Sequence, residues 1–377
     1  HLVLARTTDA PKGTKGISLF LVPKFEINDD GSVGSRNGVS TNSIESKMGI
    51  KGSPTCVLNF ENSKGIMIGP ENKGLSSMFT MMNLERIVVG VQGLGIAETA
   101  YQNAVAYSKE RKQGKANNST NGETDLIIKH ADIRRSLMNM KSIIEGQRSF
   151  AFWLSQQIDV SLSHDDKDVR NHASNMVALL TPVIKSFFTD NGVEITNDAI
   201  QVFGGYGYTK DQGIEQLFRD NRITPIYEGT NSVQAIDLVY RKISSEGVFE
   251  NFIKSMDSEI KNYKDEKNLE NFLNIFEKYK EILVSFTKWM RDKMNSNKDD
   301  ASAACNDYLK VLGYTALAFA WIKTLKVSFE KQGSNKDFYE DKINTGKYYF
   351  EKILPRAQSH YVVGTSGSHT TMNAKFN

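Results

Sequence analysis

The chain places one carboxylate where a general base is expected. Glu228 follows the apolar pair Ile226-Tyr227, and Gly229 lets the backbone turn sharply after it. Thr230 or Asn231 is then predicted to cap a helix, because apolar residues recur at helical spacing at Val233, Ile236, Val239, Tyr240 and Ile243. A carboxylate in an apolar setting suits proton abstraction, and a glutamate that only caps a helix is the alternative interpretation.

Two glycine-rich motifs could bring backbone close to a ligand. Gly90, Gly93 and Gly95 lie inside a helical pattern with no strand before them, so we expect them to permit close helix packing rather than to bind a dinucleotide. The run Gly204-Gly205-Tyr206-Gly207 ends a helix and exposes backbone, as a ligand site or a plain turn would. The sequence has no G-x-S-x-G, Walker A or zinc signature, which disfavours hydrolases, NTPases and metalloenzymes and predicts no metal site.

Composition limits the partners of the chain. The 377 residues include 47 basic and 44 acidic side chains, mixed along the chain without a basic stripe, so nucleic acid is not an expected partner. Cys56 and Cys305 show neither pairing nor metal-ligand spacing, which is typical of a reducing compartment. No run approaches the length of about eighteen apolar residues that a membrane span requires. These features predict a cytoplasmic protein without a membrane span.

The periodicity of the sequence predicts three regions that would position these residues. Residues 1–74 are predicted to be a partial β domain with strands at 2–5, 17–22 and 56–60 and a loop at 28–43. Residues 75–245 are predicted to be a helical bundle, with helices at 75–113, 127–161, 169–191 and 199–203, a polar loop at 114–122, and the capped helix after Thr230. Residues 246–377 are predicted to be a further helical domain, with helices at 249–263, 268–294, 301–331 and 336–354 and a stop at Pro355.

Five motifs in order carry a resemblance to a known family. They are Met48–Cys56 (MGIKGSPTC), Asn83–Arg86 (NLER), Glu110–Gly114 (ERKQG), Gln201–Tyr208 (QVFGGYGY) and Ile226–Asn231 (IYEGTN). In this order and at this spacing they resemble the successive signatures of the acyl-CoA dehydrogenases, and the resemblance covers nearly the whole chain. The segment Thr181-Pro182-Val183-Ile184-Lys185, the insertion at 114–125 and the helices beyond 246 resemble the longer subfamily, which has an extra C-terminal helical domain.

The resemblance implies a fold and a reaction. The fold would be mostly α, with the remnant of a β domain, a C-terminal four-helix bundle and an additional helical domain. The chain begins at His1 within a strand-like run, so the family's N-terminal helical domain and the first half of its β domain would precede it. The reaction would be the FAD-dependent α,β-dehydrogenation of an acyl-CoA thioester to the trans-2-enoyl-CoA, with Glu228 as the base.

The resemblance also assigns the remaining site residues. The substrate-side positions would be Asn83, Arg86, Tyr227 and Gly229. The positions that match contacts to FAD are Arg111, Gln113, Gln201, Gly204, Gly205, Thr230 and Ser232, of which Gln201, Gly204 and Gly205 match a segment that reaches FAD across a subunit interface. Ser232 stands where many short members have glutamine.

The expected partners follow from the same resemblance. They are an acyl-CoA substrate, electron-transfer flavoprotein as electron acceptor, and further copies of the chain in a homodimer or homotetramer. The acyl group stays open between sulfur-containing 3-methylmercaptopropionyl-CoA and ordinary medium- or long-chain thioesters. The alternatives are an acyl-CoA oxidase-like flavoenzyme, a flavin-binding relative with a non-metabolic role, against which the presence of Glu228 argues, and a non-catalytic helical interaction fragment.

Overall fold

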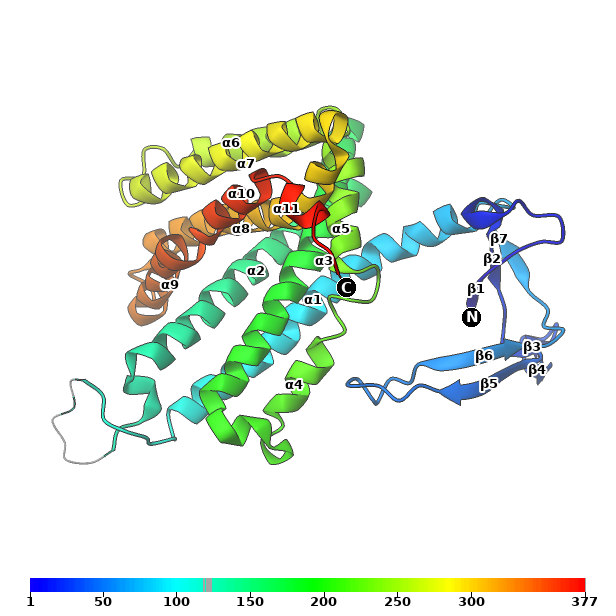
Figure 1. Cartoon of the computed structure of the whole chain (residues 1–377), viewed down its shortest axis with the longest axis horizontal. Helices are drawn as coiled ribbons and strands as arrows, with labels where there is room; N and C mark the ends of the chain where they lie inside the picture. Colours follow the sequence, from blue (N-terminus) through cyan, green and yellow to red (C-terminus); the bar gives the residue numbers. More distant parts are fainter. Residues whose placement is uncertain (118, 120–123, 377) are drawn as a thin grey trace. The chain divides into compact units, whose positions relative to one another are not determined.

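The computed structural model describes residues 1–117, 119 and 124–376, and the chain forms two compact units, His1–Glu85 and Arg86–Asn377 (Figure 1). The predicted loop at 114–122 therefore lies partly outside the described residues. Within the described part of the chain, no helix combines the length and the apolar character needed to cross a bilayer.

The first unit contains short antiparallel strands, as predicted. Strands β1 (Leu2–Ala5), β2 (Ser18–Leu21) and β7 (Ile66–Ile68) form one sheet in the order β1-β2-β7, with Leu4 opposite Leu19. Two further pairs join β3 (Phe25–Ile27) to β4 (Val33–Arg36) and β5 (Val39–Ile44) to β6 (Cys56–Phe60).

The predicted loop at 28–43 was wrong, because β4 and most of β5 fall inside it. In β5 only Val39 is buried, and the serine, threonine and asparagine residues after it are exposed. These polar side chains give no apolar alternation for the sequence to reveal. The strand is instead held by its backbone pairing with β6, which is interrupted by a register shift between Thr41 and Ser43.

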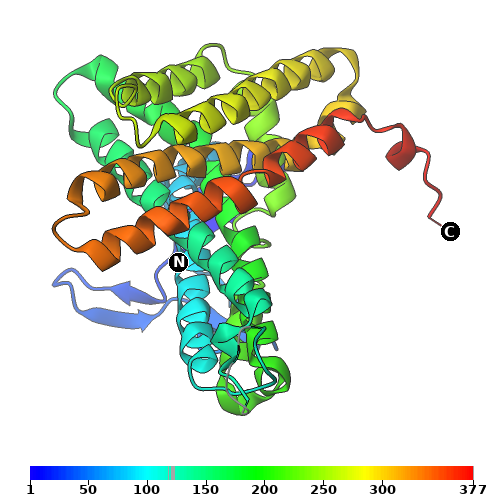
Figure 2. The same cartoon turned by 90° about the vertical axis from the view of Figure 1, so that its left-hand side faces the viewer.

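The second unit is helical. Helices α1 (Gly74–Ser108, which starts in the first unit), α2 (Ala131–Ser163) and α3 (Lys167–Phe203) lie side by side in Figures 1 and 2, and α4 (Ile214–Asn221) packs on α3. Short helical segments complete this part: η2 (Ile127–Lys129), η3 (Gly204–Tyr208), η4 (Lys210–Gln212), α5 (Asn231–Asp237) and the π-helical η5 (Leu238–Ile243).

Two predicted helix bounds were wrong. Helix α1 ends at Ser108, before the predicted end at residue 113, and α3 is continuous where two segments were predicted. Residues 192–198, which lie between the two predicted segments, are helical as well. Gly192 is a packing residue, because a Cβ at this position would lie 2.9 Å from the carbonyl oxygen of Gly93. Helix α3 also contains Pro182.

The sequence predicted that three glycines of α1 permit close helix packing, and the structure confirms this role for two of them. A Cβ on Gly90 would lie 2.7 Å from the carbonyl oxygen of Ile184, and one on Gly93 would lie 3.2 Å from Thr189, so α1 and α3 approach closely at both points. At Gly95 the prediction was wrong, since this residue is exposed and a Cβ there would meet nothing within 4 Å.

The remaining helices extend the same unit. They are α6 (Val248–Lys261), α7 (Glu270–Ser296), α8 (Lys298–Lys331), α9 (Lys336–Tyr348), the π-helical η6 (Tyr349–Ile353), α10 (Arg356–Thr365) and α11 (His369–Met372). Figure 2 shows α8 crossing α2 and α3. The contacts are intimate, because a Cβ on Gly313 of α8 would lie 2.5 Å from the ring of Phe187 on α3.

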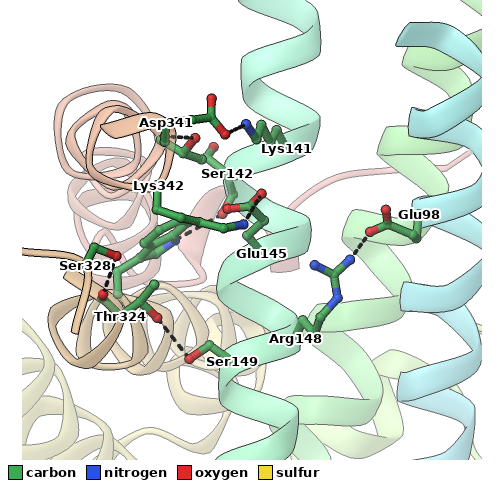
Figure 3. A network of polar contacts seen from close by, with 12 residues as sticks. Glu98, Lys141, Ser142, Glu145, Arg148, Ser149, Thr324, Ser328, Asp341 and Lys342 are labelled. Atoms are coloured by element: carbon green, nitrogen blue, oxygen red, sulfur yellow. Dashed lines mark hydrogen bonds and ion pairs between the residues drawn. The ribbon is translucent and has the colours of Figure 1, made fainter. Parts of the chain in front are cut away.

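Polar contacts on both sides of α2 tie these helices together (Figure 3). On one side, Glu145 pairs with Lys342 of α9 at 2.7 Å, Lys141 pairs with Asp341, and the hydroxyl groups of Ser149 and Thr324 are 3.2 Å apart. On the other side, Arg148 of α2 pairs with Glu98 of α1 (Figure 3). Helix α2 therefore links the bundle to the C-terminal helices.

Candidate functional site

The segment from Pro225 to Asn231 forms a turn with two consecutive residues in the left-handed region. The φ angle is 56° at Glu228 and 83° at Gly229. A non-glycine residue with positive φ costs on the order of 1–3 kcal/mol, and such residues are enriched at active sites. Among the described residues from 86 onward, Glu228 is the single non-glycine residue with this conformation.

Hydrogen bonds within the turn define its exit into α5. The hydroxyl oxygen of Thr230 accepts a hydrogen bond from the backbone N–H of Val233 at 3.3 Å, so Thr230 is the helix cap and this prediction is confirmed. The side-chain amide of Gln234 donates to the carbonyl oxygen of Glu228 at 3.0 Å. A Cβ on Gly229 would lie 2.8 Å from this amide nitrogen, so position 229 has no room for a side chain as placed.

The Glu228 carboxylate has an uncommitted oxygen. Glu228 is partly buried, and its Oε2 atom is itself buried and makes no hydrogen bond within the described part of the chain. A buried carboxylate oxygen without a donor loses the solvation that would stabilise its charge. Such an oxygen is available to accept a proton from a bound molecule, as a general base must.

Lys185, a fully buried lysine in the middle of α3, contacts this turn. Its ammonium group donates to the carbonyl oxygen of Gly229 at 2.8 Å and to the side-chain oxygen of Asn231 at 2.9 Å. The Asn231 amide nitrogen in turn donates to Asp190 at 2.7 Å and to Thr189 at 3.0 Å. The turn that presents Glu228 is thus bonded to two successive turns of α3.

Charged groups from three elements surround Lys185. Burial lowers the pKa of Lys185 to about 8; Asp190 of α3 opposes this shift, Arg86 of α1 reinforces it, and Glu228 also opposes it. Burial raises the pKa of Asp190, against the influence of Lys310 and other nearby groups. At neutral pH Lys185 therefore stays mainly protonated, although burial disfavours its charge.

The structure brings several of the predicted substrate-side residues together. Arg86 is buried on α1, and its guanidinium lies 4.0 Å from the place of a Cβ on Gly229. The Tyr227 hydroxyl group donates to the side-chain oxygen of Gln92, also on α1. Asn83 is exposed on the part of α1 that belongs to the first unit.

A second group of predicted residues surrounds the C-terminal end of α3. Gly204 ends the helix with a φ of 60°, and a Cβ on Gly204 or Gly205 would meet nothing within 4 Å, so this exposed backbone is open to a ligand. Gln201 is exposed one turn earlier. The guanidinium of Arg111 lies over the ring of Tyr206, 5.5 Å from its centre, and both side chains are exposed.

Gln113 lies close to Arg111 in the sequence, and its backbone is anchored while its side chain stays exposed. Its N–H donates to the carbonyl oxygen of Asp125 at 2.9 Å, and its carbonyl oxygen accepts from His130 at 2.8 Å. An accessible guanidinium beside open backbone suits the phosphates of a nucleotide cofactor such as FAD. The residues present therefore fit this group.

The two groups of predicted residues lie apart within one chain. The Glu228 group meets α3 at Lys185, and the second group lies at the end of α3, at Phe203. At 1.5 Å per residue, these two positions are about 27 Å apart along the helix. Thr230 and Ser232, both exposed, belong to the Glu228 group. The predicted cofactor residues Arg111, Gln113, Gln201, Gly204 and Gly205 belong to the other.

Lys185 was not predicted to be a site residue. The sequence did hold a signal, because Lys185 is a single cation among apolar residues between Thr181 and Phe188. A lysine is seldom fully buried unless it is paired. What could not be read from the sequence is its partner, since Gly229 is 44 residues away.

Two family profiles match most of the chain. Residues 72–243 match the acyl-CoA dehydrogenase C-terminal domain, and residues 252–375 match the domain described as acetyl-CoA dehydrogenase C-terminal like. The chain belongs to the acyl-CoA dehydrogenase family. The second match confirms the predicted longer subfamily with additional C-terminal helices.

Similar proteins extend over almost the whole chain. The 3-methylmercaptopropionyl-CoA dehydrogenase of Ruegeria pomeroyi is 34% identical over 371 residues, which are 96% of this chain and 62% of that protein. The chain thus spans less than two thirds of the length of this relative.

Solved structures confirm the fold class. Caenorhabditis elegans ACDH-11, crystallised with C11-CoA, matches 100% of this chain and 61% of its own with a TM-score of 0.74 at 23% identity. The acyl-CoA dehydrogenase of Bacillus anthracis, crystallised with FAD, matches 98% of this chain and 62% of its own with a TM-score of 0.76 at 19% identity.

Proposed function

We propose that Glu228 is the catalytic base of an acyl-CoA dehydrogenase and removes the α-proton of an acyl-CoA thioester. The observation that carries this proposal is the buried Oε2 atom of Glu228, which has no hydrogen-bond donor among the described residues and lies on a left-handed turn. Family membership supports it, and so do the structural neighbours, one bound to C11-CoA and one to FAD.

The chemistry explains why a carboxylate of this kind is needed. The α-proton of a thioester is weakly acidic, so a poorly solvated carboxylate must meet it while hydrogen bonds polarise the carbonyl group. Glu228 would accept that proton, with Tyr227 and Gly229 beside it and Arg86 and Asn83 on the substrate side. Bound FAD would supply the acceptor for the β-hydrogen as hydride. The product would be the trans-2-enoyl-CoA.

We further propose that the cofactor residues act in two copies of the chain. Thr230 and Ser232 would contact FAD in the site of their own Glu228. Arg111, Gln113, Gln201, Gly204 and Gly205 would contact the FAD of a neighbouring subunit in a homodimer or homotetramer. The separation of about 27 Å along α3 supports this division. Electron-transfer flavoprotein is the proposed electron acceptor.

The acyl group is proposed to be short and linear, with 3-methylmercaptopropionyl-CoA as the first candidate because of the Ruegeria pomeroyi relative. Medium- and long-chain thioesters are the second choice. An acyl-CoA oxidase would differ by rapid reoxidation of the reduced flavin by oxygen. A non-catalytic helical interaction fragment would bind no flavin.

The test is flavin reduction by acyl-CoA without oxygen. In the FAD-loaded protein, Glu228→Gln should keep the cofactor and lower the rate of flavin bleaching by about 10²–10⁴-fold, because an amide is nearly isosteric with a carboxylate but not basic. Glu246→Gln, at an exposed loop position, is the matched control and should bleach at the parent rate. Bleaching of Glu228→Gln at the parent rate would exclude Glu228 as the base.

A further inference from the structure

Lys185 is a buried cation to which the proposed reaction assigns no step. It is fully buried on α3, and its ammonium group makes hydrogen bonds of 2.8 and 2.9 Å to Gly229 and Asn231. A lysine in the interior loses hydration and side-chain entropy, so this position is expensive for the fold unless its contacts compensate.

The contact that Lys185 makes is to the backbone of the turn itself. Gly229 follows Glu228, and both residues have positive φ. A left-handed glutamate persists only where surrounding contacts over-determine its conformation. Gln234 binds the carbonyl oxygen of Glu228 from the helix that follows, and Lys185 binds the next carbonyl oxygen from α3. The carbonyl oxygens of both left-handed residues therefore accept hydrogen bonds, one from α5 and one from α3.

Charged and polar groups around Lys185 also hold its ammonium group in place. The groups that act on it are Arg86 of α1, Asp190 of its own helix and Glu228 of the turn. Asn231 connects the ammonium group to Asp190 by hydrogen bonds of 2.9 and 2.7 Å. Hydrogen bonds from a charged donor are stronger than neutral ones, and the network fixes the donor in place.

We propose that Lys185 is a positioning residue: by holding the carbonyl oxygen of Gly229 and the side chain of Asn231, it locks the left-handed Glu228–Gly229 turn and so fixes the direction of the Glu228 carboxylate. This inference rests on the proposed function for its kinetic consequence only. The contrasting interpretation is a buried lysine that contributes stability alone. The two interpretations differ in what happens to the turn and to the rate per bound flavin.

The test compares Lys185→Met with Thr196→Val in the full chain loaded with FAD. Thr196 is buried on the same helix, and its hydroxyl group donates to the carbonyl oxygen of Gly192 inside α3, so its loss affects stability without touching the turn. Lys185→Met should speed hydrogen exchange at the amides of residues 226–231 by about tenfold or more, because local opening becomes easier. It should also lower the limiting rate of flavin reduction by about 10- to 100-fold at unchanged FAD content and substrate affinity, as expected for a base displaced by about 1 Å.

Thr196→Val should show neither effect, whatever its unfolding midpoint. Parent rate and parent exchange in Lys185→Met, with lost stability only, would overturn the proposal. If Lys185→Met does not fold, Lys185→Gln is judged by the same two measurements, since its side chain is uncharged and one atom too short to keep both the hydrogen bond to Gly229 and the one to Asn231. If the parent flavin is not reduced by any acyl-CoA, the proposed function fails, and the exchange comparison still decides whether Lys185 holds the turn.

Discussion

At Glu228 the requirements of the fold and of the proposed reaction conflict. The residue has a φ of 56°, which a residue with a Cβ adopts at a cost, and its Oε2 atom is buried without a hydrogen-bond donor among the described residues. Each feature costs stability, and each suits a base that must be fixed in direction and free to accept a proton. The hydrogen bonds of Gln234 and Lys185 to the two adjacent carbonyl oxygens offset part of that cost.

This argument predicts a reversed order of stability for alanine and glycine at position 228. Both Glu228→Ala and Glu228→Gly remove the carboxylate, but only alanine keeps a Cβ at positive φ, so the glycine variant should be more stable by about 1 kcal/mol. The measurement is the urea midpoint of each variant. At Gln102, exposed inside α1, the order should be the ordinary one, with alanine more stable by roughly 0.5–1 kcal/mol. The same order at both positions would show that residue 228 is not left-handed in solution.

The sequence allowed Glu228 and its capped helix to be predicted because they are neighbours along the chain. Gly229 and Thr230 lie within the same turn, and the structure confirms the sharp turn at Gly229 and the helix cap at Thr230. Lys185 and Arg86 reach this turn from α3 and α1, and a contact across so many residues follows from tertiary packing alone. The catalytic roles of these residues remain predictions.

At the scale of the elements, the crossing of α1 and α3 decides where Arg86 and Lys185 can meet the turn. Gly90 and Gly93 let the helix backbones approach closely, and Gly192 of α3 does the same from the other side. The sequence predicted that α1 is a helix and where it begins, but not where it ends. The continuity of α3 could not be predicted, because the sequence alone does not distinguish a glycine that lets two helices pack from a glycine that ends a helix.

Two alanine substitutions in α1 should therefore have opposite effects. In Gly90→Ala the new Cβ would lie 2.7 Å from the Ile184 carbonyl oxygen, and backbone cannot move aside easily, so the free energy of unfolding should fall by about 1–3 kcal/mol. In Gly95→Ala the Cβ meets open space, and the better helix propensity of alanine should raise the free energy of unfolding by up to about 1 kcal/mol. Equal effects would mean that α1 and α3 do not cross at Gly90.

At the scale of the whole molecule, the C-terminal helices share their core with the bundle. Trp321 of α8 donates to the carbonyl oxygen of Ser142 on α2 at 3.1 Å, and Gly313 of α8 lies against Phe187 of α3. Residues 86–377 accordingly form one compact unit, whereas the family profiles divide the sequence between residues 243 and 252. A division in the sequence need not be a division of the core, so the predicted boundary between 245 and 246 stays a prediction.

The position of the two groups of site residues leads to a prediction about assembly. If Arg111 serves the FAD of a neighbouring subunit, then a defect at Arg111 and a defect at Glu228 fall in different active sites of a mixed dimer. Arg111→Ala should lose a charge-assisted contact of roughly 1.5–3 kcal/mol and with it most of its FAD. Glu228→Gln should keep FAD and lose turnover. Each variant alone should then be nearly inactive.

Joint assembly of the two inactive variants should restore activity. Random pairing makes half of the dimers mixed, and each mixed dimer has one intact site and one site with both defects, so about a quarter of the parent activity should return. The measurement is flavin reduction in a one-to-one mixture that has been co-expressed or dissociated and reassociated. One control is each variant treated in the same way by itself. The other is a mixture of Glu246→Gln with Arg111→Ala, which should be as active as the same mixture made with the parent protein in place of Glu246→Gln. If the mixture is no more active than its two components, Arg111 and Glu228 serve the same site within one chain, and the shared-site proposal fails.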